Sequence, residues 1–262
     1  MNEKTLIVIA LLIAFGLIAY EYFFVLPNPS SISYINKEVP ANVINELKIP
    51  ENISDQIGIG LASNLPKMVN GTPILINGKP TVLYISAEYC PFCAAERWAL
   101  VIALLRFGNF TKLHYMASSA YDYAPDTPTF TFYNSSYNSN YINFVAVELT
   151  TRNLTSNNTY QILQRPNAWE NATFNKYDPN GSIPFLDINN ETITIGANYD
   201  PMEIESYNYT EIIDMLYNSS TPISRYIIGS ANLITAQICK ADGNKPVSVC
   251  NASYVKSIES KL

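Results

Sequence analysis

Residues 81–105, TVLYISAEYCPFCAAERWALVIALL, decide the fold of this 262-residue chain. The first six are apolar and rich in β-branched residues, which predicts a buried strand. Residues 94–105 are strong helix formers with apolar side chains on nearly every face. The motif Cys90-Pro91-Phe92-Cys93 lies between the two, so we expect Cys90 at the N-terminus of the helix.

That position suits thiol chemistry. Unpaired backbone N–H groups and the helix dipole favour an anion there, and they lower the pKa of a thiol. Cys93 returns to the same helical face one turn later, where it can attack a mixed disulfide on Cys90. Pro91 fits the first helical turn. The alternatives are a structural disulfide or half of a zinc site, for which two further ligands at matching spacing are not evident.

The segment Ala87-Glu88-Tyr89-Cys90-Pro91-Phe92-Cys93 resembles the active site of thioredoxin-fold proteins. Extended through Ala94-Ala95-Glu96-Arg97-Trp98, it resembles an archaeal family of membrane-anchored, exported thioredoxin-like proteins of uncharacterised function. The resemblance covers most of the chain after residue 70. It implies an α/β thioredoxin-like fold in which Cys90 is the nucleophile and Cys93 the resolving cysteine, with no cofactor and no metal.

A second segment, GSIPFLDI at 181–188, has the form of a strand opened by Ile-Pro, with a turn at 189–190 into residues 191–196. In thioredoxin folds a cis-proline opens the strand that faces the cysteine pair. The resemblance therefore implies that Pro184 is cis and presents the backbone of Ile183 to an extended substrate. The alternative is an ordinary proline on an edge strand.

Two departures from the family pattern stand out. Tyr84 occupies the position where thioredoxins often carry a buried acid, which leaves proton transfer to water or to Glu88. The chain between Cys90 and Pro184 is also long, so we expect an insertion at about residues 120–175. We predict that residues 111–117 form the next core strand. Within the insertion we predict a hairpin of 130–133 with 141–149 and a short helix at 157–163.

The C-terminal part is predicted to be helical. Residues 209–217 fit the last helix of the fold, and 223–238 form a further apolar helix. This helix is expected to cover the apolar helix 94–107, the alternative cover being a partner protein. Cys239 and Cys250 are expected to form a structural disulfide worth roughly 2–3 kcal/mol. A second redox pair that relays electrons to Cys90 and Cys93 is the alternative.

The N-terminus carries a long apolar run. Residues 6–26 would span about 31 Å as a helix, which matches the hydrocarbon core of a membrane. We interpret the run as an uncleaved signal anchor with its N-terminus in the cytoplasm; a cleaved signal peptide and a pilin-like helix are the alternatives. The predicted organisation is an anchor at 1–27, a linker with a short helix at 28–72, a thioredoxin-like domain at 73–221 and a C-terminal helix and tail at 222–262.

Composition supports export. Only 15% of residues are charged, with a net charge of −6 and one histidine, which argues against nucleic-acid binding and His-based catalysis. Chance predicts about four Asn-x-Ser/Thr sequons, whereas the chain has twelve, as expected of a glycosylated exported protein. The candidate glycosylation sites are Asn52, Asn70, Asn109, Asn134, Asn153, Asn157, Asn171, Asn180, Asn190, Asn208, Asn218 and Asn251.

Two functions are compatible with these observations. The first is a membrane-anchored thiol–disulfide oxidoreductase outside the cytoplasm, whose partners are thiols and disulfides of exported proteins. The second is a glycosylated accessory subunit of a surface assembly or membrane complex, with a thioredoxin fold that is redox-inactive.

Overall fold

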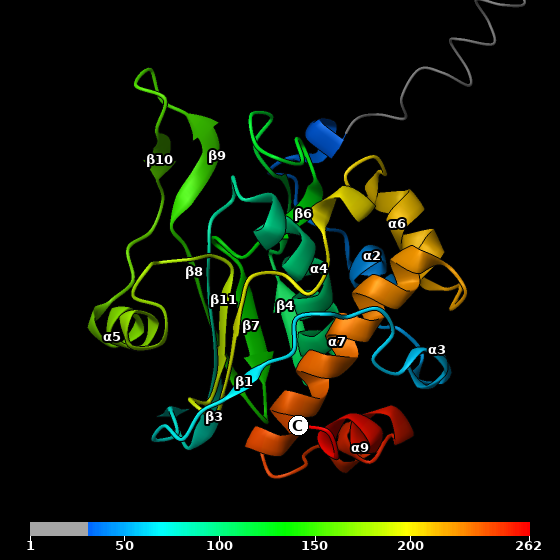
Figure 1. The fold of residues 1–262 in the computed structure, drawn as a ribbon. Coiled ribbons are helices and arrows are strands. Elements are labelled where there is room, and N and C mark those ends of the chain that lie inside the picture. Colours follow the sequence, from blue (N-terminus) through cyan, green and yellow to red (C-terminus); the bar gives the residue numbers. More distant parts are fainter. Residues whose placement is uncertain (1–30) are drawn as a thin grey trace, which may run out of the picture.

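A computed structural model of the protein describes residues 31–262, which form a mixed α/β structure (Figure 1). Its helical elements are η2 (Ser31–Tyr34), α2 (Ala41–Glu46), α3 (Glu51–Ile57), α4 (Pro91–Leu105), α5 (Ala168–Tyr177), η3 (Pro201–Glu203), α6 (Tyr209–Leu216), α7 (Pro222–Ala241), α8 (Val247–Cys250) and α9 (Ser253–Glu259). Its strands are β1 (Lys67–Met68), β2 (Leu75–Ile76), β3 (Lys79–Ser86), β4 (Gly108–Thr111), β5 (His114–Ala117), β6 (Pro128–Thr131), β7 (Ser136–Ser139), β8 (Asn143–Glu148), β9 (Thr150–Leu154), β10 (Tyr160–Ile162), β11 (Phe185–Ile188) and β12 (Thr192–Ile195).

Strand β3 lies at the centre of a six-stranded mixed sheet with the order β1-β12-β11-β3-β2, and β8 also pairs with β3. The pairing with β8 is parallel, whereas β11 and β2 run antiparallel to β3. Tyr84 lies opposite Leu186 on β11 and Ala146 on β8. The strand that precedes the cysteine motif is thus held by hydrogen bonds on both edges.

The side chains of β3 alternate between two cores, as the period of a strand requires. Val82 and Tyr84 pack in the large core with α4 and α7, whereas Leu83 and Ile85 pack in a smaller core with Phe174 of α5. Figure 1 shows α4 and α7 on one side of the sheet and α5 on the other. The apolar run of β3 is therefore explained by a sheet that is covered on both faces.

Helix α4 is buried along its whole length, and Phe92 is the only exposed one of its fifteen residues. Helix α7 packs against it. Trp98 of α4 also contacts Phe130 of β6 edge to face, with 4.7 Å between the ring centroids. The prediction that the C-terminal helix covers α4 is confirmed, because α7 supplies this cover from within the chain.

Several predicted elements are confirmed, namely the strand at 81–86, the hairpin after Pro184 and the helices at 209–217 and 223–238. Three others are wrong. Residues 111–117 do not join the central sheet, because β5 pairs with β6. Residues 141–149 are not half of an added hairpin but contain β8, the parallel neighbour of β3. Residues 157–163 contain β10, paired with β9, instead of a helix.

Residues 31–72, which the sequence analysis assigns to a linker, pack against the rest of the domain. Leu47 is fully buried in the large core, and β1 extends the central sheet by pairing with β12. The predicted short helix is α2, and α3 follows it. Pro40 and Pro50 come directly before α2 and α3, so they mark the starts of short elements that dock on the core.

The predicted membrane anchor, residues 6–26, lies outside the described residues. Within residues 31–262 no helix is long and apolar enough to cross a membrane.

Gly229 on α7 gives a direct test of the docking of this N-terminal segment. A Cβ atom at this position would lie 2.3 Å from the carbonyl oxygen of Ile59. At a free helical site Gly→Ala stabilises by up to about 1 kcal/mol. Here we expect Gly229→Ala to lower the free energy of unfolding by about 1–3 kcal/mol, because the backbones must move apart. Urea denaturation measures this change.

Ser257→Ala, at an exposed position of α9, is the control and should change the free energy of unfolding by less than about 0.5 kcal/mol. If Gly229→Ala were as stable as the wild type, residues 59–60 would not lie against α7.

Candidate functional site

Cys90 is the N-cap residue of α4, and Pro91 is the first residue of that helix. Its Sγ accepts a hydrogen bond from the backbone N–H of Cys93 at 3.2 Å. Both cysteines are free thiols. Cys90 keeps 5% of its surface exposed and Cys93 none, so Cys90 is the one that a substrate can reach.

The two thiols differ in acidity. A hydrogen bond from the Cys93 thiol lowers the pKa of Cys90; burial opposes this effect, while the Cys93 N–H and the positive charge of Arg97 add to it. Burial raises the pKa of Cys93 well above its usual value. These shifts favour a thiolate on Cys90 and a protonated Cys93.

Pro184 lies at the same site. The Ile183–Pro184 peptide bond is cis, and the carbonyl oxygen of Ile183 lies 4.0 Å from the Sγ of Cys90. Strand β11 begins at the next residue and pairs with β3. The structure thus brings together Cys90, Cys93 and Pro184, although they are about 90 positions apart in the sequence.

Tyr84, at the position where the family pattern has an acid, is fully buried, and its hydroxyl donates to the carbonyl oxygen of Cys93 at 3.2 Å. Burial raises its pKa well above the usual value, so it stays neutral. Glu88 accepts a hydrogen bond from the Thr131 hydroxyl at 2.7 Å, and burial raises its pKa to about 6. Tyr84 therefore fixes the first turn of α4, and Glu88 is a buried acid bonded to Thr131.

A buried ion pair that was not predicted from the sequence lies beside the cysteines. Arg97 and Glu148 are both fully buried, and the guanidinium donates from Nε (3.0 Å) and Nη2 (2.6 Å) to the two carboxylate oxygens. Nη2 also donates to the carbonyl oxygen of Ala87 at 2.8 Å. The only local signal was a Glu-Arg pair in an otherwise apolar helix, and the partner is 51 residues away.

Glu96, the sequence neighbour of Arg97, is also fully buried, but its side chain contacts a different element. It accepts hydrogen bonds from the backbone N–H (3.0 Å) and side-chain amide (2.9 Å) of Asn198, in the loop after β12. Burial raises its pKa to about 7. On the opposite face of the sheet, burial likewise raises the pKa of Asp187 to about 7. Both carboxyls are thus protonated more readily in the folded chain.

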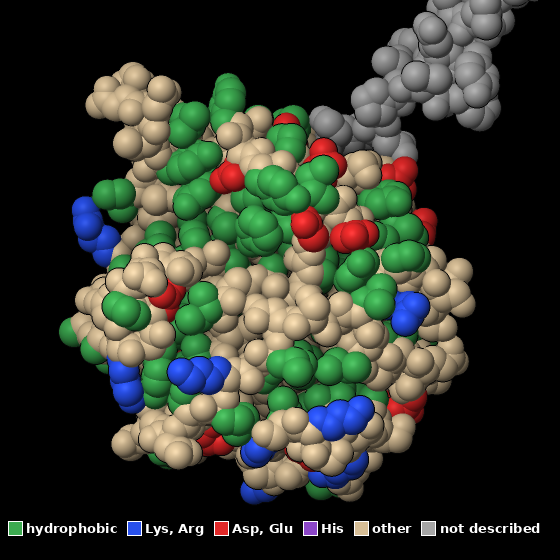
Figure 2. Space-filling view, viewed as in Figure 1, with side chains coloured by type: hydrophobic (Ala, Val, Ile, Leu, Met, Phe, Trp, Pro, Cys, Tyr) green, Lys and Arg blue, Asp and Glu red, His purple; other side chains and the backbone are tan. Residues whose placement is uncertain are grey.

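Aromatic rings flank the cysteines. Phe92, between them, stacks on Tyr123 with 5.8 Å between centroids, and Tyr89 stacks on Tyr160 of β10 at 4.0 Å. The Tyr123 hydroxyl donates to Asp200 at 3.2 Å. Figure 2 shows hydrophobic side chains gathered at the end of the molecule where α4 begins, interspersed with Asp and Glu. The thiol site therefore opens into a largely apolar surface.

Cys239 and Cys250 form a disulfide between the end of α7 and α8, and both are fully buried. The two cysteines are separated by 11 positions in the sequence, and the disulfide links the C-terminal tail covalently to the core. Within residues 31–262 no group of three or more His, Cys, Asp or Glu side chains is arranged to hold a metal ion.

Ten of the candidate glycosylation sites are exposed, and Asn208, which caps α6, is partly buried. Asn190 is a correction, because it is 9% exposed and its amide is occupied. The Nδ2 that would carry a glycan donates to the carbonyl oxygen of Thr72 at 2.8 Å, and Oδ1 accepts from the Tyr177 hydroxyl. A glycan on Asn190 is incompatible with this fold.

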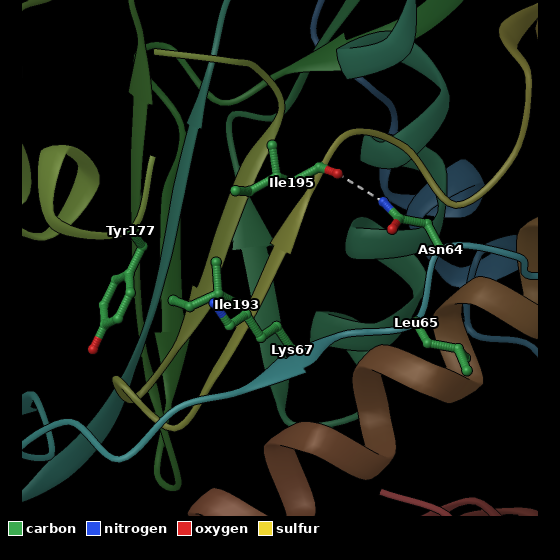
Figure 3. A pocket seen from close by; sticks show the side chains of 6 residues that line it. All are labelled: Asn64, Leu65, Lys67, Tyr177, Ile193 and Ile195. Carbon is green, nitrogen blue, oxygen red and sulfur yellow. Dashed lines mark hydrogen bonds between the residues drawn. The ribbon is translucent and has the colours of Figure 1, made fainter. Parts of the chain in front are cut away.

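A separate hollow of about 250 Å³ lies beside β1 and β12 (Figure 3). It is lined by Asn64, Leu65, Lys67, Tyr177, Ile193 and Ile195, and Asn64 donates to the carbonyl oxygen of Ile195 at 2.8 Å. None of the cysteines lines it, so it does not belong to the thiol site.

The buried carboxyls predict a pH dependence of stability. Glu96 has a pKa of about 7 in the folded chain and about 4.5 when unfolded, so the folded state binds more protons between these values. Stability is therefore fully present below pH 4.5 and falls as the pH rises to 7. We expect Glu96→Gln to be about as stable as the wild type at pH 4.5 and more stable at pH 8, by up to about 3 kcal/mol. Urea denaturation from pH 4.5 to 8 measures both. Equal slopes for the two proteins would contradict a buried, readily protonated Glu96.

A family model for a domain of unknown function, DUF929, matches residues 66–240, about two thirds of the chain. The match begins at β1 and ends in α7, and it includes Cys90, Cys93 and Pro184. No curated protein and no solved structure matches the chain. The protein belongs to the family that is defined by the DUF929 domain.

Proposed function

We propose that this protein is a thiol–disulfide oxidoreductase with a thioredoxin-like fold. The observation that carries the proposal is the meeting of three groups: the Cys90 thiol at a helix N-terminus, the fully buried Cys93 and the backbone of Ile183 before a cis-proline. The order of elements supports it, since a central strand leads into the Cys-x-x-Cys helix and the proline opens the antiparallel neighbour of that strand.

The chemistry follows from the difference between the two thiols. The Cys90 thiolate attacks one sulfur of a substrate disulfide, that S–S bond breaks, and the other substrate sulfur leaves as a thiolate and takes up a proton. Cys93 then loses its proton and attacks the Cys90 sulfur, which releases the second substrate thiol. The protein is left with a Cys90–Cys93 disulfide, two electrons have moved to the substrate, and every step is reversible.

The fold also suggests how a substrate chain is held. The carbonyl oxygen of Ile183 faces the Cys90 sulfur and can accept a hydrogen bond from an extended polypeptide. The rings of Phe92, Tyr123 and Tyr89 add apolar contact area around the same sulfur. This arrangement favours protein substrates over small thiols.

Trapping tests the proposal. Cys93→Ala removes the resolving thiol, so mixed disulfides between Cys90 and substrate proteins should accumulate at the cell surface and appear on non-reducing gels. Cys90→Ala/Cys93→Ala is the control and should trap nothing. Equal patterns for the two variants would reject Cys90 as the nucleophile.

We further propose that the domain is exported and anchored by the apolar segment at 6–26, in a single-pass arrangement with residues 31–262 outside the cytoplasm. The twelve sequons and the Cys239–Cys250 disulfide support this, since sugars and stable disulfides belong outside the cytosol.

Glycan mapping by mass spectrometry tests the export proposal. Sugars are expected at exposed sequons such as Asn153 and Asn157 on or next to the β9–β10 hairpin, whereas Asn190 should be unmodified because its amide is buried and bonded. A chain from the native membrane with no glycan at any sequon would count against the proposal.

The second candidate function is a redox-inactive accessory subunit of a surface assembly. The observation that favours it is the small exposure of Cys90, 5%. The apolar surface of α4 does not support this second function, because α7 covers that helix from within the chain and no partner protein is needed to cover it. A Cys90–Cys93 reduction potential below about −300 mV, together with no trapped partner, would favour this function over the first.

A further inference from the structure

The Arg97–Glu148 ion pair is buried behind the cysteines, and the reaction above does not use it. Burying two charges is costly, so a buried pair is weak evidence of a contribution to stability. In this pair the carboxylate is well satisfied: Glu148 also accepts from the Ser86 hydroxyl at 2.7 Å and from the backbone N–H of Phe132 at 3.3 Å. The guanidinium is not, because Nη1 of Arg97 is buried and has no hydrogen-bond partner.

The spacing on α4 and one hydrogen bond place the guanidinium on the side of the thiols. Arg97 lies four residues after Cys93, so the two side chains share one face of α4. Its Nη2 donates to the Ala87 carbonyl oxygen, which also accepts the backbone N–H of Cys90 at 3.3 Å. At Cys90 the positive charge adds to the hydrogen bond from Cys93 in lowering the pKa, and at Cys93 it opposes part of the rise in pKa that burial causes.

We infer that Arg97, held in place by Glu148, is a positioning residue that stabilises the reduced Cys90–Cys93 pair and so directs the protein to oxidise dithiols of exported polypeptides. The inference rests on the proposed function and adds its direction. A cation beside the pair favours the thiolate over the uncharged disulfide, and stabilising the reduced form makes a cysteine pair a stronger oxidant.

The reaction in this direction balances. A substrate thiolate attacks Cys90 in the Cys90–Cys93 disulfide, and Cys93 leaves and takes up a proton. A second substrate thiolate then attacks the first substrate sulfur in the mixed disulfide. The Cys90 sulfur is the leaving group, and it leaves as the thiolate beside Arg97. The substrate loses two thiol protons and two electrons and gains a disulfide. The protein pair gains the electrons and is reoxidised by a second protein disulfide of higher reduction potential.

Two variants with opposite expected signs test the role of the ion pair in the full chain. In Arg97→Met/Glu148→Gln both charges are removed, so no unpaired charge is left buried. We expect its equilibrium with glutathione to shift about tenfold toward the protein disulfide, about 30 mV. The pKa of Cys90, followed by thiolate absorbance, should rise. In Glu148→Gln the cation loses its counter-charge, so the reduction potential should rise and the pKa of Cys90 should fall.

The control is Arg106→Met. Arg106 is the arginine at the other end of α4, where it donates to Thr235 at 2.6 Å and Asn232 at 2.8 Å. Its loss should leave the potential and the pKa of Cys90 unchanged. A merely structural role for Arg97 would move both test variants in the same direction, and that result would overturn the inference. If either variant fails to fold, Arg97→Lys keeps the charge and should retain most of the wild-type potential, whereas a full loss would overturn the inference.

A separate measurement tests whether the protein oxidises dithiols or reduces disulfides. The oxidised wild-type protein should oxidise a reduced dithiol peptide faster than the reduced protein cleaves the corresponding disulfide peptide, and the reverse order would overturn the direction. Failure of the trapping experiment with the opposite shifts still present would reject the proposed function and leave the electrostatic role of Arg97 intact. Trapped partners without those shifts would support the proposed function and reject the electrostatic role of Arg97.

Discussion

Helix α4 is so apolar that it must be covered on every side, and the arrangement of the other elements follows from this requirement. The sheet covers one face through Val82 and Tyr84, α7 covers another, and β6 supplies Phe130 against Trp98. Burial of apolar surface contributes about 25 cal/mol per Å², so the cover over α4 stabilises the domain. The same burial removes water from the first turn of the helix, where the cysteines lie, and there the local charges act with little screening.

The sequence predicted those parts of the structure that depend on local pattern. The strand at 81–86, the helix after Cys90 and the hairpin after Pro184 each have a residue preference or a turn signal that can be recognised within about ten residues. Residues 157–163 show the limit of this approach. This stretch, which begins with two Asn residues, was expected to be helical, but Tyr160 stacks on Tyr89 and the segment pairs with β9 as a strand. A contact between distant residues overrode a weak local preference.

Long-range pairing was the other limit. Residues 114–117 and 143–148 have similar β propensity, and nothing local determines which of them lies beside β3. The structure places β8 there in parallel, after a connection that crosses the helical layer, and this choice brings Glu148 to Arg97. An ion pair between residues 51 positions apart has no local pattern, although two charges in the middle of an apolar helix do indicate that buried partners exist. The cysteines were found because their spacing is local, whereas the charged groups around them depend on topology.

The two cysteine pairs differ in how a molecule in solution meets them. The Cys239–Cys250 disulfide has no exposed surface, whereas Cys90 has a small opening beside Phe92. A thiol reagent must contact sulfur to exchange with it, so the first pair reacts only when α7 and α8 separate. The domain thus contains one disulfide that burial protects from exchange, Cys239–Cys250, and one cysteine pair that solution molecules can reach, Cys90–Cys93. Under the proposed function, repeated cycling of the Cys90–Cys93 pair would leave the covalent connection between α7 and α8 intact.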